Sequence, residues 1–189
     1  MRFNRRMQPL PPVKPIIGEN TIEPLSVCRV VDGTLFIVNQ YDDDIWRVDR
    51  QGRAFPLGWS QSGPDLLNQP VRLEYSSTQD ILVILDRNGV HLSRNRGTPS
   101  PILKILVKQP ACICVSNDEL WIAGEGLGCI SLKKRTSVFF VPVDSLISWQ
   151  AYPPADLTLS YDTGKLYILP ENNSGVAYFD ISRPSNRQP

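Results

Sequence analysis

The chain has 189 residues, of which 41% are hydrophobic and 21% are charged, and these are ordinary values for a globular protein. Twenty Lys and Arg residues against nineteen Asp and Glu leave a formal net charge of +1, which excludes a broad basic surface for nucleic acid or anionic membranes. Seventeen prolines argue against long helices, because proline lacks an amide donor and interrupts the helical hydrogen-bond ladder. The length allows one domain of ordinary size or two small ones.

The N-terminus and the cysteines bear on the cellular compartment. Basic residues open the chain but no apolar segment follows them, so we expect no secretory signal. The apolar runs are too short to span a bilayer, and without export we expect the four cysteines to be reduced and buried. These features predict an intracellular, cytoplasmic protein with no membrane span and no sequence-specific nucleic acid partner.

A repeated pattern dominates the chain, in which turn residues precede a leucine that opens a β-rich run. The four anchor leucines are Leu35, Leu82, Leu120 and Leu166, separated by 47, 38 and 46 residues. A second run begins 8 to 10 residues after each anchor, at residues 45–48, 90–93, 129–132 and 176–179. Asp, Asn and Gly lie between the two runs of each repeat, which is the turn chemistry of a β-hairpin.

Each hairpin is flanked by further runs of strand character. One run precedes each anchor, at residues 27–31, 71–75, 111–115 and 155–159. A fourth run follows the hairpin in the first three repeats, at residues 53–57, 101–107 and 137–143. Four strands at a period of about 44 residues are typical of the blades of a β-propeller. A β-sandwich also has many short strands, but it gives no reason for a fourfold repeat.

We therefore predict an all-β fold, a β-propeller of four four-stranded repeats over residues 25–182. Residues 1–24 are expected to form an extended proline-rich arm and residues 183–189 a C-terminal tail. The fourth repeat ends before an outer strand of its own, so residues 2–8 are a candidate to supply that strand and close the ring. The alternative is an arc that another chain completes.

The repeat form, as in Gly164-Lys-Leu-Tyr-Ile-Leu followed by Ser174-Gly-Val-Ala-Tyr-Phe-Asp, resembles the β-propeller repeats of the NHL and WD40-like families. It lacks the Gly-His and Trp-Asp dipeptides of true WD40 blades. The arginine- and proline-bearing arm is also similar in composition to the arms of bacteriophage tail hub and nozzle proteins. That resemblance implies a structural subunit of a virion.

The chain offers few residues for chemistry. His91 is the one histidine and lies in a strand-like run, so we expect it at the surface or between repeats rather than in a catalytic triad. Cys112 and Cys114 share one face of a strand, but a zinc site needs a second such pair. Residues 42–44 are three aspartates without the spacing of a calcium loop, and the glycines of residues 124–128 are expected to shape a turn. We predict no catalytic residue, no metal and no cofactor.

Three stretches are candidate interfaces with other protein subunits. The arm of residues 1–24 is suited to lie along another surface, because dense proline favours an extended chain with no core of its own. The links at residues 57–70 and 148–152 carry apolar side chains where surface loops are expected, and packing back onto the ring is the alternative. The candidate interface residues are Arg2, Arg5, Arg6, Trp59, Leu66, Leu67, Trp149 and Tyr152.

The function favoured by the sequence is a non-enzymatic structural or interaction propeller that acts as a subunit of a larger assembly, in the cytoplasm or in a virion. Two alternatives remain open. A calcium-dependent propeller hydrolase or lactonase would gather polar groups at the ends of inner strands, with Asp32, Asn39, Asp86 and Glu171 as candidates. A sugar-binding propeller would repeat one aromatic position, for which the candidates are Phe36, Val83, Trp121 and Tyr167.

Overall fold

The computed structural model describes residues 23–59, 67–94, 97–101, 107–134, 136–142, 154–160, 162–171 and 175–181. In these residues every regular element is a β-strand, so the predicted all-β class is confirmed. The strands form four antiparallel sheets, which we number 1 to 4 in chain order, and each sheet is built from consecutive strands.

The sheets have the following strands. Sheet 1 contains β1 (Pro24–Arg29), β2 (Leu35–Asn39), β3 (Asp44–Val48) and β4 (Ala54–Pro56). Sheet 2 contains β5 (Arg72–Ser76), β6 (Ile81–Asp86), β7 (Gly89–Arg94) and β8 (Ser100–Pro101). Sheet 3 contains β9 (Cys112–Ser116), β10 (Glu119–Gly124), β11 (Gly126–Ser131) and β12 (Thr136–Pro142). Sheet 4 contains β13 (Pro154–Ser160), β14 (Lys165–Pro170) and β15 (Ala177–Asp180).

Each repeat predicted from the sequence corresponds to one sheet. The four predicted inner runs overlap β1, β5, β9 and β13, and the four hairpins overlap the two strands that follow in each sheet. Three sheets have the expected fourth strand, whereas sheet 4 has three described strands. The strand that residues 2–8 were predicted to add to the last repeat lies outside the described residues.

Side chains alternate across each strand, so each sheet presents one face to the sheet before it and one to the sheet after it. The anchor leucine faces the preceding sheet, as Leu82 packs with sheet 1 residues and Leu166 with sheet 3 residues. The next residue faces the following sheet, as Phe36 packs with sheet 2 and Trp121 with sheet 4. At each junction between sheets, the anchor leucine of the later sheet thus packs toward the earlier sheet, and the residue after the anchor of the earlier sheet packs toward the later sheet.

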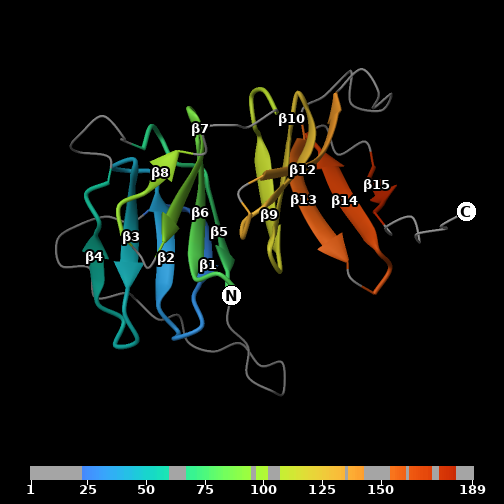
Figure 1. Cartoon of the computed structure of the whole chain (residues 1–189). Coiled ribbons are helices and arrows are strands. Elements are labelled where there is room, and N and C mark those ends of the chain that lie inside the picture. Colours follow the sequence, from blue (N-terminus) through green and yellow to red (C-terminus); the bar gives the residue numbers. More distant parts are fainter. Residues whose placement is uncertain are drawn as a thin grey trace, which may run out of the picture.

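The core of the described residues is divided among the three junctions. One hydrophobic cluster joins sheets 1 and 2, a second joins sheets 2 and 3, and a third joins sheets 3 and 4. The inner strands make the closest approach, because β1 contacts β5, β5 contacts β9 and β9 contacts β13. Figure 1 shows this order, with the blue sheet 1 and green sheet 2 on one side and the yellow sheet 3 and orange sheet 4 on the other.

Sheets 1 and 4 do not form a fourth junction of this kind among the described residues. No hydrophobic cluster there combines residues of these two sheets, and β1 and β13 lack the close packing that joins the other inner strands. In the described part of the chain, the sheets thus form an open arc. Closure of the ring by residues 2–8, which lie outside the described residues, and completion of an arc by another chain both stay predictions.

Candidate functional site

The inner strands bring a small polar cluster together at the axis of the arc. Arg72 on β5 forms an ion pair with Asp156 on β13, with 2.5 Å between Nη2 and Oδ1. The pair reaches past β9, which contacts both strands, and so ties sheet 2 to sheet 4. The backbone N–H of Leu73 donates to the hydroxyl of Ser26 at 3.1 Å and ties sheet 2 to sheet 1. These bonds hold the arc together.

Glu74 is the one acid in this cluster whose pKa is raised. Burial disfavours its charged form, the nearby carboxylate of Asp156 adds to that effect, and Arg72 opposes it. The neighbouring thiols of Cys112 and Cys114 face sheet 4, as their spacing on one strand predicted. Burial raises the pKa of Cys112 to about 12 and that of Cys114 to about 11. At neutral pH these thiols are protonated, which makes them poor nucleophiles.

A second feature recurs where the chain leads into the inner strands of sheets 1, 2 and 3. The last residue of the second strand holds this lead-in segment: Asn39 Oδ1 accepts from the N–H of Glu23 at 2.7 Å, and Asp86 Oδ2 accepts from the N–H of Asn68 at 2.8 Å. In sheet 3 the same position is Gly124, and the lead-in backbone at residues 108–109 lies directly against it. The amide of Glu125 then donates to the carbonyl of Lys108 at 2.8 Å.

These lead-in segments carry a sequence signal that the predicted repeat did not include. A proline opens or closely precedes each inner strand, at Pro24, Pro70, Pro110 and Pro154. Proline suits the start of a strand, because its fixed φ is compatible with extended backbone and it needs no ladder partner for an N–H. The residues before two of these prolines, Gln69 and Gln109, both have positive φ values of 50° and 44°. The repeat thus includes the turn that leads into the strand.

The carboxylate of Asp86, the last residue of β6, has several partners in the fold. It accepts from the backbone N–H groups of Asn68, Asn88 and Gly89, and His91 Nε2 lies 3.0 Å from its Oδ2. Burial alone would raise its pKa, but the bonds from His91 and from the backbone outweigh burial, so the pKa is lowered. His91 is buried opposite Ile84, on the face toward sheet 1, so of the two predicted positions it has the one between repeats and not the one at the surface.

The three aspartates of residues 42–44 are also engaged in the fold. Asp42 accepts from Asn39 Nδ2 and from Trp46 Nε1, both at 2.8 Å. The buried Asp44 accepts from the N–H groups of Gly58 and Trp59 at 2.7 and 3.1 Å, and so fixes the start of the link after sheet 1. Among the residues the structure describes, no three His, Cys, Asp or Glu side chains lie close enough together to hold a metal ion.

The candidates for a hydrolase site do not converge. Asn39 and Asp86 lie at the ends of β2 and β6, where they bind the lead-in segments described above. Asp32 lies in the turn before β2, at the other end of that strand, and its carboxylate accepts from the N–H of Thr34. Glu171 follows β14 and is exposed. Asn39 and Asp86 thus bond to the fold itself, and Asp32 lies at the opposite end of its strand from Asn39.

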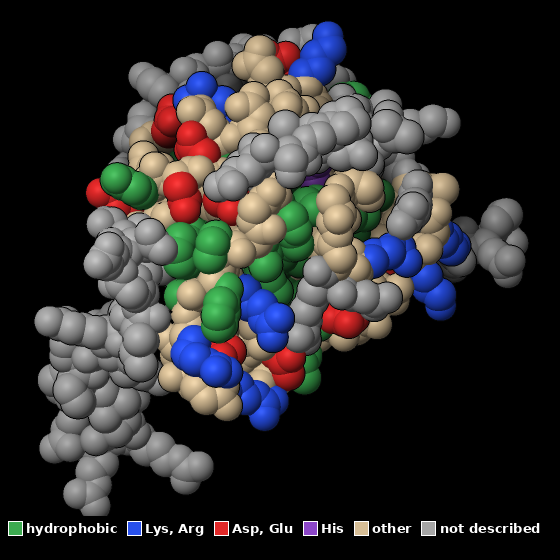
Figure 2. All heavy atoms as spheres, turned by 90° about the vertical axis from the view of Figure 1, so that its left-hand side faces the viewer, with side chains coloured by type: hydrophobic (Ala, Val, Ile, Leu, Met, Phe, Trp, Pro, Cys, Tyr) green, Lys and Arg blue, Asp and Glu red, His purple; other side chains and the backbone are tan. Residues whose placement is uncertain are grey.

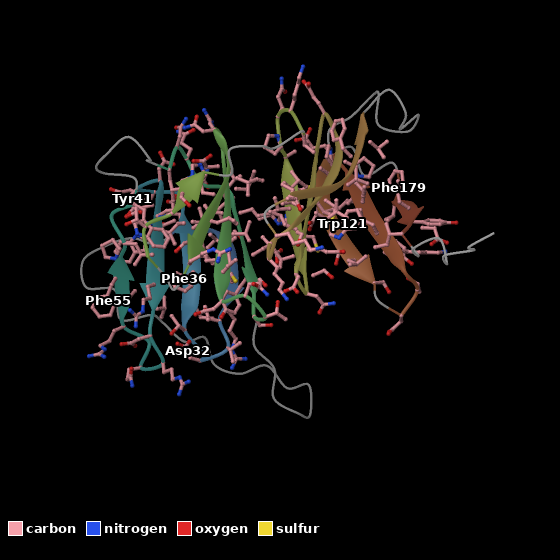
Figure 3. All side chains as sticks on the ribbon, viewed as in Figure 1. Asp32, Phe36, Tyr41, Phe55, Trp121 and Phe179 are labelled. Carbon is pink, nitrogen blue, oxygen red and sulfur yellow. The ribbon has the colours of Figure 1, made fainter. Side chains whose placement is uncertain are left out.

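The repeated aromatic position is divided between the core and an open face. Phe36, Val83 and Trp121 are buried in the three junctions, and Figure 3 shows Phe36 and Trp121 in the interior of the arc. Tyr167, the fourth member, is half-buried on the outward face of sheet 4. In the first three repeats this position thus packs sheets together, which was the alternative to sugar binding.

Two of the predicted interface residues can be placed. Leu67 is 3% exposed and belongs to the cluster between sheets 1 and 2, and Trp59 packs against the same cluster. The link after sheet 1 thus packs back onto the sheets at these two residues, which was the alternative to an outward contact site. The predicted interface residues Arg2, Arg5, Arg6, Leu66, Trp149 and Tyr152 lie outside the described residues.

The perimeter beside sheet 1 carries a different surface. Tyr41 and Phe55 are exposed there, and Figure 3 shows both at the margin of the molecule. Figure 2 shows hydrophobic side chains near the middle of this side, with Lys and Arg gathered below them. The exposed arginines of this region include Arg47, opposite Phe55 in the sheet, and Arg53, which pairs with Asp49 at 2.7 Å. The pairing with Asp49 offsets part of the positive charge.

The outward faces of sheets 1 and 4 are the largest departure from the repeat. Val27 occupies the position of Leu73, Ile113 and Leu157, because each is paired with the residue two places after the anchor leucine. Leu73, Ile113 and Leu157 are 3%, 0% and 4% exposed, whereas Val27 is 60% exposed. The repeat places an apolar side chain here to meet a preceding sheet, and sheet 1 has none among the described residues.

The opposite end shows the same mismatch. Tyr178 occupies the position of Leu92 and Cys129, because each is paired with the residue that follows the anchor leucine. Leu92 and Cys129 are 7% and 1% exposed, whereas Tyr178 is 57% exposed. In sheet 1 the same position is held by Arg47, which is exposed. Lys165 lies 4.0 Å from the centroid of the Tyr178 ring, at the edge of this surface. Each end of the arc therefore presents one half of a junction.

The exposed part of the sheet 1 face lies near the axis. Leu25 and Val27 on β1 are exposed, and Leu35 and Ile37 on β2 are half-buried. Farther from the axis, Trp46 on β3 is buried and its indole N–H is bonded to Asp42. The open surface is thus centred on the strands that make the closest contacts at the internal junctions.

Four antiparallel sheets in chain order, joined through their inner strands and by hydrophobic clusters between successive faces, define a β-propeller-like fold. Comparison with solved structures supports this class. The chain is similar to Kuenenia stuttgartiensis hydrazine synthase, with a TM-score of 0.62, 17% identity, and coverage of 87% of this chain and 49% of that one. It is similar to a chain of a nidogen/laminin complex, with a TM-score of 0.67, 11% identity, and coverage of 87% and 63%.

A computationally designed protein, Ika4, matches over nearly its whole length, with a TM-score of 0.62, 8% identity, and coverage of 89% of this chain and 99% of that one. The chain spans about half to two thirds of the two natural proteins named before it. No family model and no curated protein matches the sequence. In the part of the chain that the structure describes, no helix has the length and apolar character needed to cross a membrane.

Proposed function

We propose that the chain is a non-enzymatic interaction module, a propeller segment that acts within a larger assembly by packing its two end faces against further β-sheets. The observation that supports this proposal is the pair of half-junctions. Val27 is 60% exposed at a position that the other three repeats bury almost completely, and Tyr178 is 57% exposed at a position that is buried in sheets 2 and 3 and exposed, as Arg47, in sheet 1. Apolar surface of this kind is stabilised by removal from water, at roughly 25 cal/mol per Å².

The polar groups of the arc support a structural role. Arg72, Asp156 and Asp86 hold strands and lead-in segments in place. The cysteine thiols have raised pKa values because they are buried, which suits packing and not nucleophilic chemistry. A bacteriophage tail subunit would be a more specific form of this function, and its support is the composition of the N-terminal arm.

Site-specific photo-crosslinking in cells that produce the chain tests the proposal. A photoreactive residue is placed at Val27, at Tyr178 or at the control position Val138, which is equally exposed on the outer strand β12 but lies on neither end face. We expect protein crosslinks from both end positions well above those from Val138. Equal yields at the three positions would show that the end faces are not contact surfaces and would refute the proposed function.

A further inference from the structure

We infer that the sheets that complete each end of the arc belong to a second copy of this chain, so that two copies form one closed ring of eight sheets. This inference rests on the proposed function and names the partner. Sheet 4 of each copy would pack its outward face on the outward face of sheet 1 of the other copy. The two end surfaces are called the sheet 1 face (Leu25, Val27, Leu35 and Ile37) and the sheet 4 face (Tyr167, Leu169 and Tyr178) from here on.

The two faces are complementary, because they carry the two sides of a junction between successive sheets. At every internal junction the residue after the anchor of one sheet packs against the anchor side of the next, as Phe36 packs in one cluster with Leu82 and Ile84. The sheet 4 face carries the first of these elements at Tyr167, and the sheet 1 face carries the second at Leu35 and Ile37. A junction between the two faces therefore repeats one that the chain already makes three times.

The two faces do not pack on each other within one chain. If sheet 1 packed on sheet 4 of the same chain, Val27 and Tyr178 would be buried together, but both are exposed. Both faces are thus left for an external partner.

The chain is shorter than the natural propeller-like chains that it resembles. The chain aligns over 87% of its length with 49% and 63% of two natural propeller-like chains, so its arc corresponds to about half to two thirds of a larger protein. At the 49% share, two copies together match the length of the larger chain. A head-to-tail contact repeated twice around a twofold axis closes without a free face, whereas one that does not close generates filaments. An eight-sheet ring is within the range of known propellers, which have four to eight blades.

Light scattering after size-exclusion chromatography tests the inference on the full chain. We expect the wild-type protein to have about twice the 21.3 kDa mass of one chain. Val27→Glu and Tyr178→Glu each place an unpaired charge in both junctions, so each variant is expected to associate about 100-fold more weakly and to elute as a monomer. Val138→Glu is the matched control and is expected to remain a dimer. Circular dichroism checks that all three variants are folded.

A mixing experiment tests the head-to-tail geometry. A Val27→Glu chain keeps an intact sheet 4 face, and a Tyr178→Glu chain keeps an intact sheet 1 face. An equimolar mixture can therefore form one unmodified junction, and we expect it to regain dimer that neither variant forms alone. If Val27→Glu dissociates while Tyr178→Glu remains a dimer, sheet 1 faces pack on each other and the inference is wrong.

Three further results would overturn the inference that a second copy completes the ring. A monomeric wild-type chain overturns the second-copy inference, as does a mass that grows steadily with concentration, because the ring would then not close. Dimerisation only after deletion of residues 1–22 would show that the chain's own arm is the occupant and would equally overturn it. If the wild-type chain is a monomer but residues 27 and 178 crosslink to another protein in cells, the proposed function stands and only the second copy is excluded.

Discussion

Replacing Gly124 by alanine is expected to destabilise the protein by about 3 kcal/mol, although alanine normally improves a strand position. Glycine in a strand interior is worse than alanine by roughly 0.5–1 kcal/mol, because it loses more conformational freedom on folding. Its φ is not in the left-handed region, so backbone geometry alone permits a side chain. Without a packing conflict the substitution would therefore be stabilising.

The conflict comes from the lead-in segment of sheet 3. A Cβ at position 124 would lie 2.8 Å from both the carbonyl carbon of Gln109 and the carbonyl oxygen of Lys108, and closer still to the carbonyl oxygen of Gln109. These are backbone atoms, so no side chain can rotate away. The segment is held on either side by bonds of 2.8 Å, from Glu125 N to Lys108 O and from Ala111 N to Ala123 O.

The magnitude follows from these contacts. Overpacking of a rigid site costs roughly 1–3 kcal/mol, and each weakened backbone hydrogen bond costs about 1 kcal/mol. A net loss of about 3 kcal/mol corresponds to a fall in Tm of about 6–12 °C for a chain of this size. Urea and thermal unfolding, followed by the fluorescence of the four tryptophans, measure the change.

The matched control is Gly52→Ala, at a turn where an added Cβ meets nothing within 4 Å. Its φ is +82°, so alanine there carries only a backbone cost of about 1–2 kcal/mol. A Gly124→Ala protein that is as stable as the wild type, or more stable, would refute the reasoning, since it would show that the lead-in segment does not lie against β10.

Two further predictions concern carboxylates whose pKa values are shifted by the fold. Asp86→Ala leaves His91 and three backbone N–H groups without their acceptor, so we expect a loss of about 3–5 kcal/mol in urea unfolding at neutral pH. Because the folded-state pKa of Asp86 is lowered, the stability that its charge contributes is complete above its unfolded pKa of 3.8 and disappears as the pH falls through the lower folded value. If the wild type and Asp86→Ala differed in unfolding free energy by the same amount in strong acid as at neutral pH, the charge of Asp86 would not be the source of this stability. Glu74→Gln should be more stable than the wild type at neutral pH, because the raised pKa of Glu74 means that its charged form is disfavoured by folding. This advantage should vanish as the pH falls below the unfolded pKa of 4.5, where both side chains are neutral, and a Gln variant weaker than the wild type at neutral pH would show that the charge of Glu74 is stabilising.

The sequence predicted the strands well because the physical signal is local and is repeated. The anchor leucines and the alternation around them place ten or more strands within a few residues of the observed bounds, and both depend only on which face each side chain occupies. The same alternation predicted that Cys112 and Cys114 share a face. Spacing on a strand is sufficient for such statements.

Features that depend on the angle between sheets could not be predicted in this way. The Arg72–Asp156 pair joins residues 84 positions apart, and the alternation around each residue does not indicate that the two side chains meet. The burial of Leu67 depends on how the link after sheet 1 folds back over the first cluster. Whether sheets 1 and 4 meet depends on the rotation accumulated over three junctions, to which many small packing contacts contribute. The open ends therefore became visible only in three dimensions.

The division of the core into pairwise clusters has a consequence for how the molecule comes apart. Each sheet is stabilised chiefly by its immediate neighbours, as in a linear array of modules, so a defect in one junction propagates weakly to the others. Sheet 4, at the end of the array with three described strands, is the module expected to open first in hydrogen exchange. The Arg72–Asp156 pair joins sheet 4 directly to sheet 2. When sheet 4 opens, sheet 2 therefore loses this ion pair as well.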